Sequence, residues 1–174
     1  LDGFVNKLLI LPNEIEKDIS SDILKENEIS YLLYGDHEIE KFENTNHNFF
    51  LNETTSWALT TSGTTGRPKV IVHTLETLIR SSKKNTNDYV WGLVYSPSRF
   101  AGLQVVFQAL IGGGKLVLTD SAQNFTGMVD VFLKKNVNAI SATPTMWRKF
   151  IMDGRILGLD LFQITLGGEI VDQK

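Results

Sequence analysis

The chain has 174 residues, of which 42% are hydrophobic and 21% charged, a composition typical of one globular domain and not of a disordered chain. A formal net charge of −3 leaves no basic field for a nucleic acid or an anionic membrane surface. The absence of cysteine excludes disulfides and thiolate metal sites, and no apolar run reaches the roughly 20 residues that span a bilayer. We therefore expect a cytoplasmic protein that binds a small molecule, without a membrane span and without a nucleic-acid partner. The composition does not tell whether the protein is a monomer or an oligomer.

The first part of the chain alternates short apolar runs with acidic, Asn-rich stretches. Over residues 1–53 this pattern predicts short strands and one small helix, and residues 38–55 read as a surface loop or strand connection. Residues 57–61 predict a strand that runs into a loop rich in Gly and Thr at 62–68. Residues 69–73 then predict a second strand, so this part reads as strand, loop, strand.

Three apolar stripes follow at helical spacing. Leu75, Leu78 and Ile79 predict a short helix, which we expect Lys83 and Lys84 to close because cations suit the negative end of a helix dipole. Residues 103–111 and 125–133 carry longer stripes, and Gly112 to Gly114 end the first of them.

Short apolar strands separate these helices. They are predicted at residues 89–95, 115–118 and 139–142, and a further helix starts at Thr143 with Pro144 in its first turn. Strands that alternate with helices of about ten residues indicate βαβ units. The predicted fold class is α/β, a parallel sheet covered by helices, as a single domain over residues 1–174. In such sheets ligands bind beyond the carboxyl ends of the strands.

Residues 60–69, TTSGTTGRPK, carry the chemistry that the sequence indicates. Gly63 and Gly66 allow backbone N–H groups close to an anion, the hydroxyl side chains add donors, and Arg67 and Lys69 add positive charge. Such a loop suits a polyphosphate, although it lacks the spacing of a Walker-type P-loop. The alternative reading is a flexible, hydroxyl-rich hairpin turn between two strands.

The order of these residues resembles a known signature. TSGTTGRPK is similar at every position to the phosphate loop of the adenylate-forming superfamily, which includes acyl- and aryl-CoA ligases, luciferases and nonribosomal peptide adenylation domains. Residues 95–103, YSPSRFAGL, resemble the segment in which many members have a histidine where this chain has Arg99. Residues 142–146, ATPTM, resemble the family's Pro-Thr turn, and residues 166–169, LGGE, resemble the segment against the adenine and ribose.

The resemblance implies that ATP activates a carboxylate substrate as an acyl-adenylate and that a thiol, often coenzyme A, then takes the acyl group. The residues that it implies around the β- and γ-phosphates are Thr61, Ser62, Gly63, Thr64, Thr65 and Gly66. Lys69 supports that loop, and Gly167, Gly168 and Glu169 border the adenosine. Arg99 becomes an acyl-pocket candidate, which favours a substrate with a second anionic group. Magnesium is expected to arrive with ATP, because His37, His47 and His73 have no metal-ligand spacing.

Several family motifs are missing from these residues. Members have a Tyr-Gly-x-Thr-Glu motif, a ribose-binding Asp and a C-terminal lid domain with a catalytic Lys after the Gly-Gly-Glu segment, and residues 170–174 contain none of them. We therefore expect an N-terminal-domain fragment or a natural short relative that is inactive alone. A second hypothesis is a nucleotide-binding or scaffolding module that retains the fold without catalysis.

Overall fold

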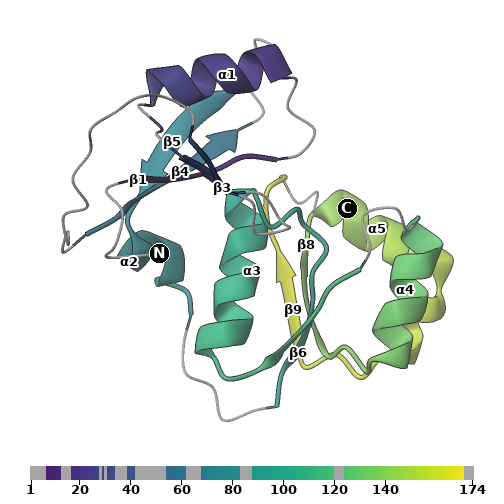
Figure 1. The fold of residues 1–174 in the computed structure, drawn as a ribbon. Coiled ribbons are helices and arrows are strands. Elements are labelled where there is room, and N and C mark those ends of the chain that lie inside the picture. Colours follow the sequence, from purple (N-terminus) through teal and green to yellow (C-terminus); the bar gives the residue numbers. More distant parts are fainter. Residues whose placement is uncertain are drawn as a thin grey trace. The chain divides into compact units, whose positions relative to one another are not determined.

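The computed structural model describes residues 7–12, 17–27, 29, 31–33, 39–41, 54–61, 68–82, 88–119 and 124–170. Figure 1 shows the arrangement of the elements. Contacts between residues divide the chain into two compact units, Leu1–Thr77 and Leu78–Lys174. Because this division does not decide whether the chain is one folding domain, the expectation of a single domain stays a prediction.

The first unit contains two small sheets. One has the order β1 (Lys7–Ile10), β4 (Ser56–Thr61) and β5 (Lys69–His73), with β4 parallel to β1 and antiparallel to β5. The other pairs β2 (Tyr31–Leu33) with β3 (Ile39–Lys41) in antiparallel fashion. The two strands of the predicted strand, loop, strand are confirmed as β4 and β5, and residues 62–67 between them lie outside the described residues. β3 lies in the stretch that reads as a loop or strand connection.

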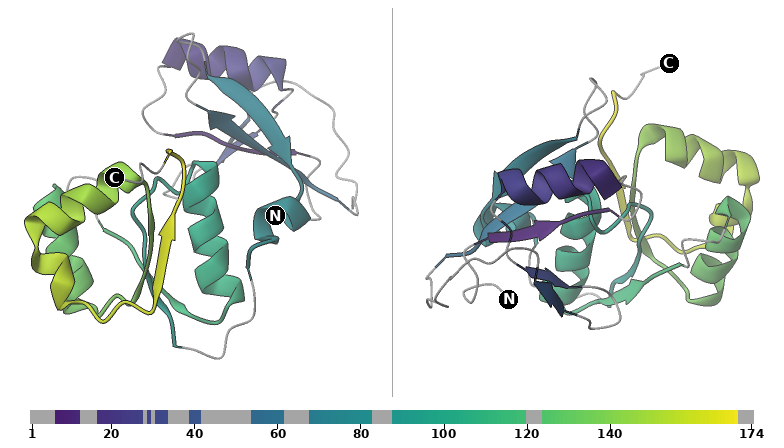
Figure 2. Two further views of the ribbon diagram at one scale, coloured as in Figure 1. Left: turned by 180° about the vertical axis from the view of Figure 1, so that it is seen from behind. Right: turned by 45° about the horizontal axis from the view of Figure 1, so that its top comes forward.

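One helix covers the three-stranded sheet of this unit. α1 (Lys17–Glu26) lies along a face of that sheet in both Figure 1 and Figure 2. Ile23 and Leu24 of α1 are buried, as are Ala58 and Leu59 of β4. Burial of apolar side chains is the dominant favourable term in folding, so these two elements carry the core of the unit. The predicted small helix among short strands is confirmed.

The second unit contains a four-stranded sheet in which every pair of strands is parallel. Its order is β7, β6, β8, β9, and the strands are β7 (Lys115–Val117), β6 (Val90–Gly92), β8 (Ala139–Ala142) and β9 (Gln163–Leu166). The helices between them are α3 (Phe100–Ile111), α4 (Phe125–Lys134) and α5 (Pro144–Asp153), and the 3₁₀ helix η1 (Arg155–Gly158) follows α5. The predicted α/β class, a parallel sheet covered by helices, is confirmed.

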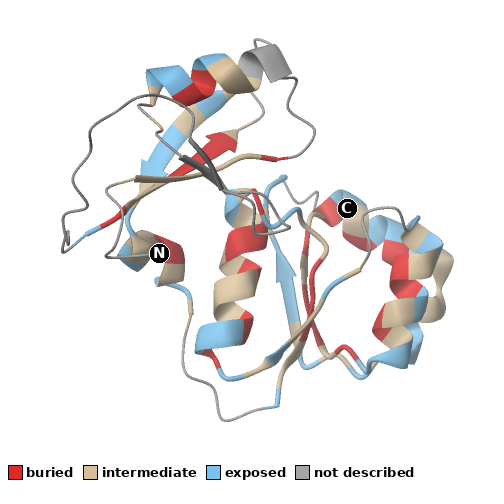
Figure 3. Cartoon of the chain, in the orientation of Figure 1, coloured by how far each residue is buried: buried red, intermediate tan, exposed pale blue. Residues whose placement is uncertain are grey.

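Helices cover both faces of this sheet. Figures 1 and 2 show α3 on one face and α4 with α5 on the other. Adjacent residues of β8 point to opposite faces, so Ala139 packs in the cluster of Trp91, Val105 and Ala109 on the α3 side. The neighbouring Ile140 belongs to the larger cluster beneath α4 and α5, which contains Met128, Val129, Phe132, Val137, Ala142, Trp147, Phe150 and Ile156. Figure 3 shows red, buried segments both on these helices and on the strands between them.

Two predicted boundaries are wrong. The strand expected at residues 89–95 is shorter, because pairing with β8 ends at Gly92 opposite Ile140 and Tyr95 already lies in a bend. The short helix α2 (Leu75–Ile79) ends before the two lysines expected to close it, because the Ser82 N–H donates to the Ile79 carbonyl at 2.7 Å and closes a turn. Lys83 and Lys84 lie outside the described residues.

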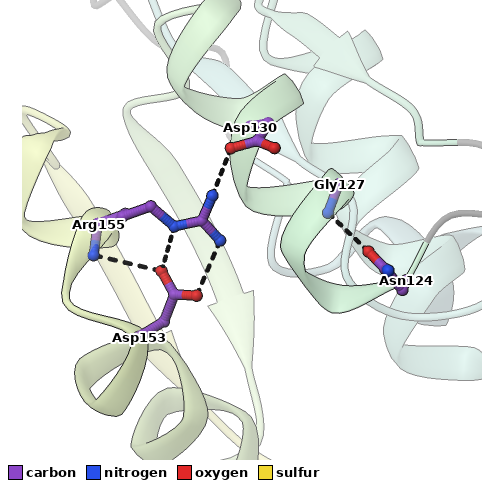
Figure 4. A network of polar contacts seen from close by, with 5 residues as sticks. All are labelled: Asn124, Gly127, Asp130, Asp153 and Arg155. Carbon is purple, nitrogen blue, oxygen red and sulfur yellow. Dashed lines mark hydrogen bonds and ion pairs between the residues drawn. The ribbon is translucent and has the colours of Figure 1, made fainter.

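An ion-pair network joins α4 to the end of α5 (Figure 4). Nε of Arg155 lies 2.7 Å from Oδ1 of Asp153 and its second terminal nitrogen donates to Oδ2 at 2.8 Å, while the other terminal nitrogen pairs with Asp130 of α4. The same figure shows Asn124, whose side chain accepts from the Gly127 N–H at 2.9 Å and caps the start of α4. The guanidinium lowers the pKa of Asp153 through its hydrogen bond and charge.

Gly102, in the first turn of α3, has no room for a side chain. A Cβ atom there would lie 2.0 Å from the Ser96 carbonyl oxygen, whereas one at Gly113 would meet no atom within 4 Å. Gly102→Ala is therefore expected to lower the free energy of unfolding by about 2–3 kcal/mol, because backbone must move. Gly113→Ala, the control, bears only the strain of a positive φ, about 1 kcal/mol. Urea unfolding measures both, and equal losses would contradict the expected close packing at Gly102.

The contacts of Arg155 with Asp153 lead to a prediction about the pKa of Asp153. Arg155→Ala is expected to raise the pKa of Asp153 toward its ordinary value, because the largest cause of its depression is the hydrogen bond from Arg155. A depressed carboxyl pKa stabilises the fold above the unfolded-state pKa, and this stabilisation is lost as pH falls through the folded-state pKa. Carboxyl carbon NMR titration measures the shift. Arg148→Ala serves as the control, and an unchanged Asp153 pKa in Arg155→Ala would contradict the network.

Candidate functional site

The predicted phosphate loop is bracketed by two paired strands of the first unit. Thr61 ends β4, Lys69 begins β5, and these two residues are direct partners in the antiparallel ladder. The Thr61 hydroxyl donates to the Lys69 carbonyl at 3.4 Å, and the Lys69 side chain is exposed. The ladder therefore holds both ends of the loop together. Ser62, Gly63, Thr64, Thr65, Gly66 and Arg67 lie outside the described residues, so their predicted role stays a prediction.

Three other predicted segments meet at one edge of the second unit's sheet. Tyr95 follows β6, Thr143 follows β8 and Gly167 follows β9. These three strands are parallel neighbours, so their carboxyl ends lie at the same edge. This is the edge at which ligands bind in open parallel sheets.

Glu169 contacts the first turn of α5. Its Oε2 atom accepts from the Thr145 N–H at 3.0 Å and from the Thr145 hydroxyl at 2.6 Å. The pKa of Glu169 is lowered, first by the Thr145 hydroxyl and then by the Thr145 N–H, with smaller contributions from Thr143 and the charge of Arg148. Glu169 is therefore an ionised hydrogen-bond acceptor near neutral pH. Whether it borders an adenosine, as predicted, stays a prediction.

The turn before Glu169 contains two glycines with different backbone requirements. The Gly167 N–H donates to the Ala142 carbonyl at 3.3 Å, which extends the pairing of β8 with β9 by one bond. Gly168 has a φ of +83°, in the left-handed region that favours glycine. A Cβ atom on Gly168 would lie 3.6 Å from Cγ2 of Thr143, so the turn passes beside the start of α5. The predicted adenosine segment and the Pro-Thr turn are thus neighbours.

Tyr95 lies at the same edge of the sheet and is not among the predicted site residues. Burial raises the pKa of its phenol, a hydrogen bond with the Ser141 side chain lowers that pKa, and the charge of Glu169 raises it. The net shift of the Tyr95 pKa is upward, so its phenol is neutral near neutral pH. Its position at the end of an apolar strand was the available sequence signal, whereas no pattern connects it with Ser141, 46 positions later in the chain.

Arg99 begins α3 without capping it by a side-chain hydrogen bond. Its N–H donates to the Ser96 carbonyl at 3.1 Å, and its side chain is half-buried. In the same loop the hydroxyls of Ser96 and Ser98 lie 2.8 Å apart. Arg99 therefore lies directly before α3, at the end of the loop that follows β6, while its predicted contact with an acyl group stays a prediction.

Among the described residues, no group of three or more His, Cys, Asp or Glu side chains is placed to hold a metal ion. None of the helices within the described ranges has the length and apolar character needed to cross a bilayer.

The chain matches one family model and part of several large synthetases. A family model described as AMP-binding enzyme matches residues 12–172. Enniatin synthase from Fusarium equiseti is 26% identical over 126 residues, which are 68% of this chain and 4% of that protein. Apicidin F synthase from Gibberella fujikuroi is 30% identical over 122 residues, which are 67% of this chain and 2% of that protein. The chain therefore spans only a few per cent of the length of these relatives.

Comparison with solved structures shows the same fold. The o-succinylbenzoate CoA synthetase (MenE) from Bacillus subtilis, solved with an acyl-adenylate intermediate, has a TM-score of 0.71 at 18% identity. The match covers 95% of this chain and 50% of that chain. The N-terminal subdomain of NpsA from Klebsiella oxytoca, in complex with 3-hydroxyanthranilyl-AMSN, has a TM-score of 0.69 at 16% identity and covers 92% of this chain and 46% of that chain.

The two adjacent glycines provide a matched pair of variants. Gly168→Ala is expected to lower the free energy of unfolding by about 1 kcal/mol, because an L residue is strained at its positive φ. Gly167→Ala is expected to cost much less, since its φ is not in that region and a Cβ would meet no atom within 4 Å. Urea unfolding of both variants measures the difference. A larger loss for Gly167→Ala than for Gly168→Ala would contradict the turn geometry.

Proposed function

The chain belongs to the AMP-binding enzyme family, as its resemblance to the adenylate-forming superfamily predicted, and from this premise we propose that it activates a carboxylate with ATP. In this reaction a carboxylate oxygen attacks the α-phosphorus, the bond from that phosphorus to the bridging oxygen breaks, and pyrophosphate leaves with the electron pair. The products are an acyl-adenylate and pyrophosphate. The observation that carries the proposal is the family match over residues 12–172, which contains every segment assigned to the site.

The phosphate loop supports the proposal through its donors and its attachment. Negative charge accumulates on the leaving pyrophosphate, so N–H, hydroxyl and cationic donors around it lower the barrier. The residues assigned to this cradle are Thr61, Ser62, Gly63, Thr64, Thr65 and Gly66. Lys69 adds charge at the start of β5, where its carbonyl accepts from Thr61. Magnesium would bind together with ATP and would neutralise part of the negative charge of its phosphates.

The carboxyl edge of the second unit supports the assignment of the adenosine and the acyl group. Gly167, Gly168 and Glu169 are assigned to the adenosine side because residues 166–169 resemble the segment of the adenylate-forming superfamily that lies against the adenine and ribose. Arg99 is assigned to the acyl side, where a guanidinium favours a second anionic group on the substrate. A thiol would then attack the acyl carbonyl carbon and release AMP. Coenzyme A is the first acceptor to test, because MenE is a CoA synthetase by name.

The proposal predicts a graded set of affinities. Purified protein is expected to bind ATP with magnesium, and to bind an acyl sulfamoyladenosine, a stable mimic of the acyl-adenylate, at least about tenfold more tightly than AMP. A panel of such mimics with different acyl groups would identify the carboxylate. Calorimetry measures these affinities, and carboxylate-dependent exchange of pyrophosphate into ATP measures the chemistry. The expectation that residues 1–174 alone form adenylate slowly stays a prediction, which the same exchange assay tests.

Loop variants connect the binding to the assigned residues. Gly63→Val and Gly66→Val are expected to weaken ATP at least about tenfold with little change in thermal stability, because a branched side chain blocks the close approach of phosphate. Gly158→Ala, far along the chain in η1, is the control. Unchanged ATP affinity in both loop variants would overturn the phosphate assignment. ATP binding without preference for any acyl mimic over AMP would instead favour the non-catalytic nucleotide-binding module.

A further inference from the structure

Each backbone N–H group in the first turn of α5 has a hydrogen-bond acceptor. The first N–H groups of a helix have no partner within the helix. Pro144 has no N–H, the Met146 N–H donates to the Thr143 hydroxyl at 3.2 Å, and the Trp147 N–H donates to the Thr143 carbonyl at 2.9 Å. The remaining N–H of this turn belongs to Thr145, and its acceptor is the Glu169 carboxylate. Glu169, 24 positions later in the chain, therefore completes the capping of α5.

The same carboxylate is one of two anchors of the glycine turn. The Gly167 N–H donates to the carbonyl of Ala142, at the end of β8, and Glu169 accepts from Thr145, in the first turn of α5. Gly168 lies between these anchors with its φ of +83°. Glycine loses more backbone freedom on ordering than any other residue, so a two-glycine turn held at one end only would be poorly ordered.

The charge of Glu169 suits this place. A carboxylate is favourable at a helix N-terminus, where the helix dipole is positive, and charge-assisted bonds are stronger than neutral ones. Arg148, one turn further along α5, adds an attractive charge. Both donors from Thr145 reach one oxygen, Oε2, so the contact fixes the direction of the carboxylate as well as its position.

We propose that Glu169 is a positioning residue whose contact with Thr145 holds the Gly167–Gly168 turn in place, so that the backbone of the turn, and not the carboxylate, contacts the nucleotide. This inference rests on the proposed function and deepens it. The charge of Glu169 is directed into α5, where it is compensated by the helix terminus.

The test combines the variants Glu169→Ala, Thr145→Val, their double variant and Thr145→Ser. Asp160→Ala removes another exposed carboxylate of the same unit, in the loop before β9, and is the control. Two quantities are measured on the whole chain: the ¹⁵N order parameters of Gly167 and Gly168 without ligand, and the ATP affinity by calorimetry. The order parameters report backbone motion of the turn directly.

Glu169→Ala is expected to lower both order parameters and to weaken ATP binding about three- to tenfold, and Thr145→Val to do so to a smaller extent. Because both variants break one contact, the double variant should be no more than about twofold weaker than Glu169→Ala. Thr145→Ser, which retains both donors, should restore most of the affinity, and Asp160→Ala should match the unmodified chain.

Three results would overturn the inference. Order parameters and ATP affinity that do not change in Glu169→Ala would exclude a positioning role. Additive losses in the double variant would show that Glu169 contacts the nucleotide independently of Thr145. Failure of the unmodified chain to bind ATP, with the glycine turn still loosened by Glu169→Ala, would overturn the proposed function and the nucleotide role of the contact together. If the unmodified chain binds ATP but Glu169→Ala changes neither the order parameters nor the ATP affinity, only this inference is overturned and the proposed function stands.

Discussion

Parallel pairing of β8 with strands on both sides is the constraint on which the second unit depends. Ala139 is in register with Trp91 of β6 and with Gln163 of β9. At the amino ends of these strands, the Asn138 side chain accepts from the Val90 N–H at 2.8 Å and donates to the Asp88 carbonyl at 3.1 Å. The Asn138 carbonyl accepts from Phe162 and Gln163. Asn138 thus contacts the starts of three strands, and because the three strands are parallel, their carboxyl ends point to the same edge of the sheet.

The shared direction of these strands brings separate segments to one edge of the sheet. Tyr95, Thr143 and Gly167 follow β6, β8 and β9, and side-chain contacts then join the segments in pairs. Ser141 connects β8 with Tyr95, while the Trp147 ring N–H donates to the Thr165 carbonyl at 3.0 Å and connects α5 with β9. Because Trp147 and Phe150 are buried in the core beneath α5, the position of this helix is determined by packing as well as by polar contacts. The packed core therefore holds α5 in place at the carboxyl edge of the sheet.

The two ends of α5 carry carboxylates in opposite electrostatic situations. Glu169 contacts the positive N-terminal end of the helix. The hydrogen bonds from Thr145, and not a cation, are the largest causes of its lowered pKa. Asp153 lies at the negative C-terminal end, where a carboxylate is unfavourable, and the Arg155 fork offsets this. The pKa of each carboxyl group is lowered, but the N-terminal one is held by hydroxyl and N–H donors and the C-terminal one by a guanidinium.

The sequence alone determined the α/β class, the parallel sheet, the helical stripes and the family, because hydrophobic periodicity and a contiguous motif are local properties of the chain. It also placed Lys69 after the loop and Gly112 at the end of α3. It misplaced the ends of β6 and α2, which depend on how far a neighbouring strand continues to pair and on where a turn closes. The contacts of Glu169 with Thr145 and of Tyr95 with Ser141 join residues 24 and 46 positions apart, and only the tertiary structure decided them. No local pattern encodes such pairs, since they exist only after parallel pairing has brought the strand ends together.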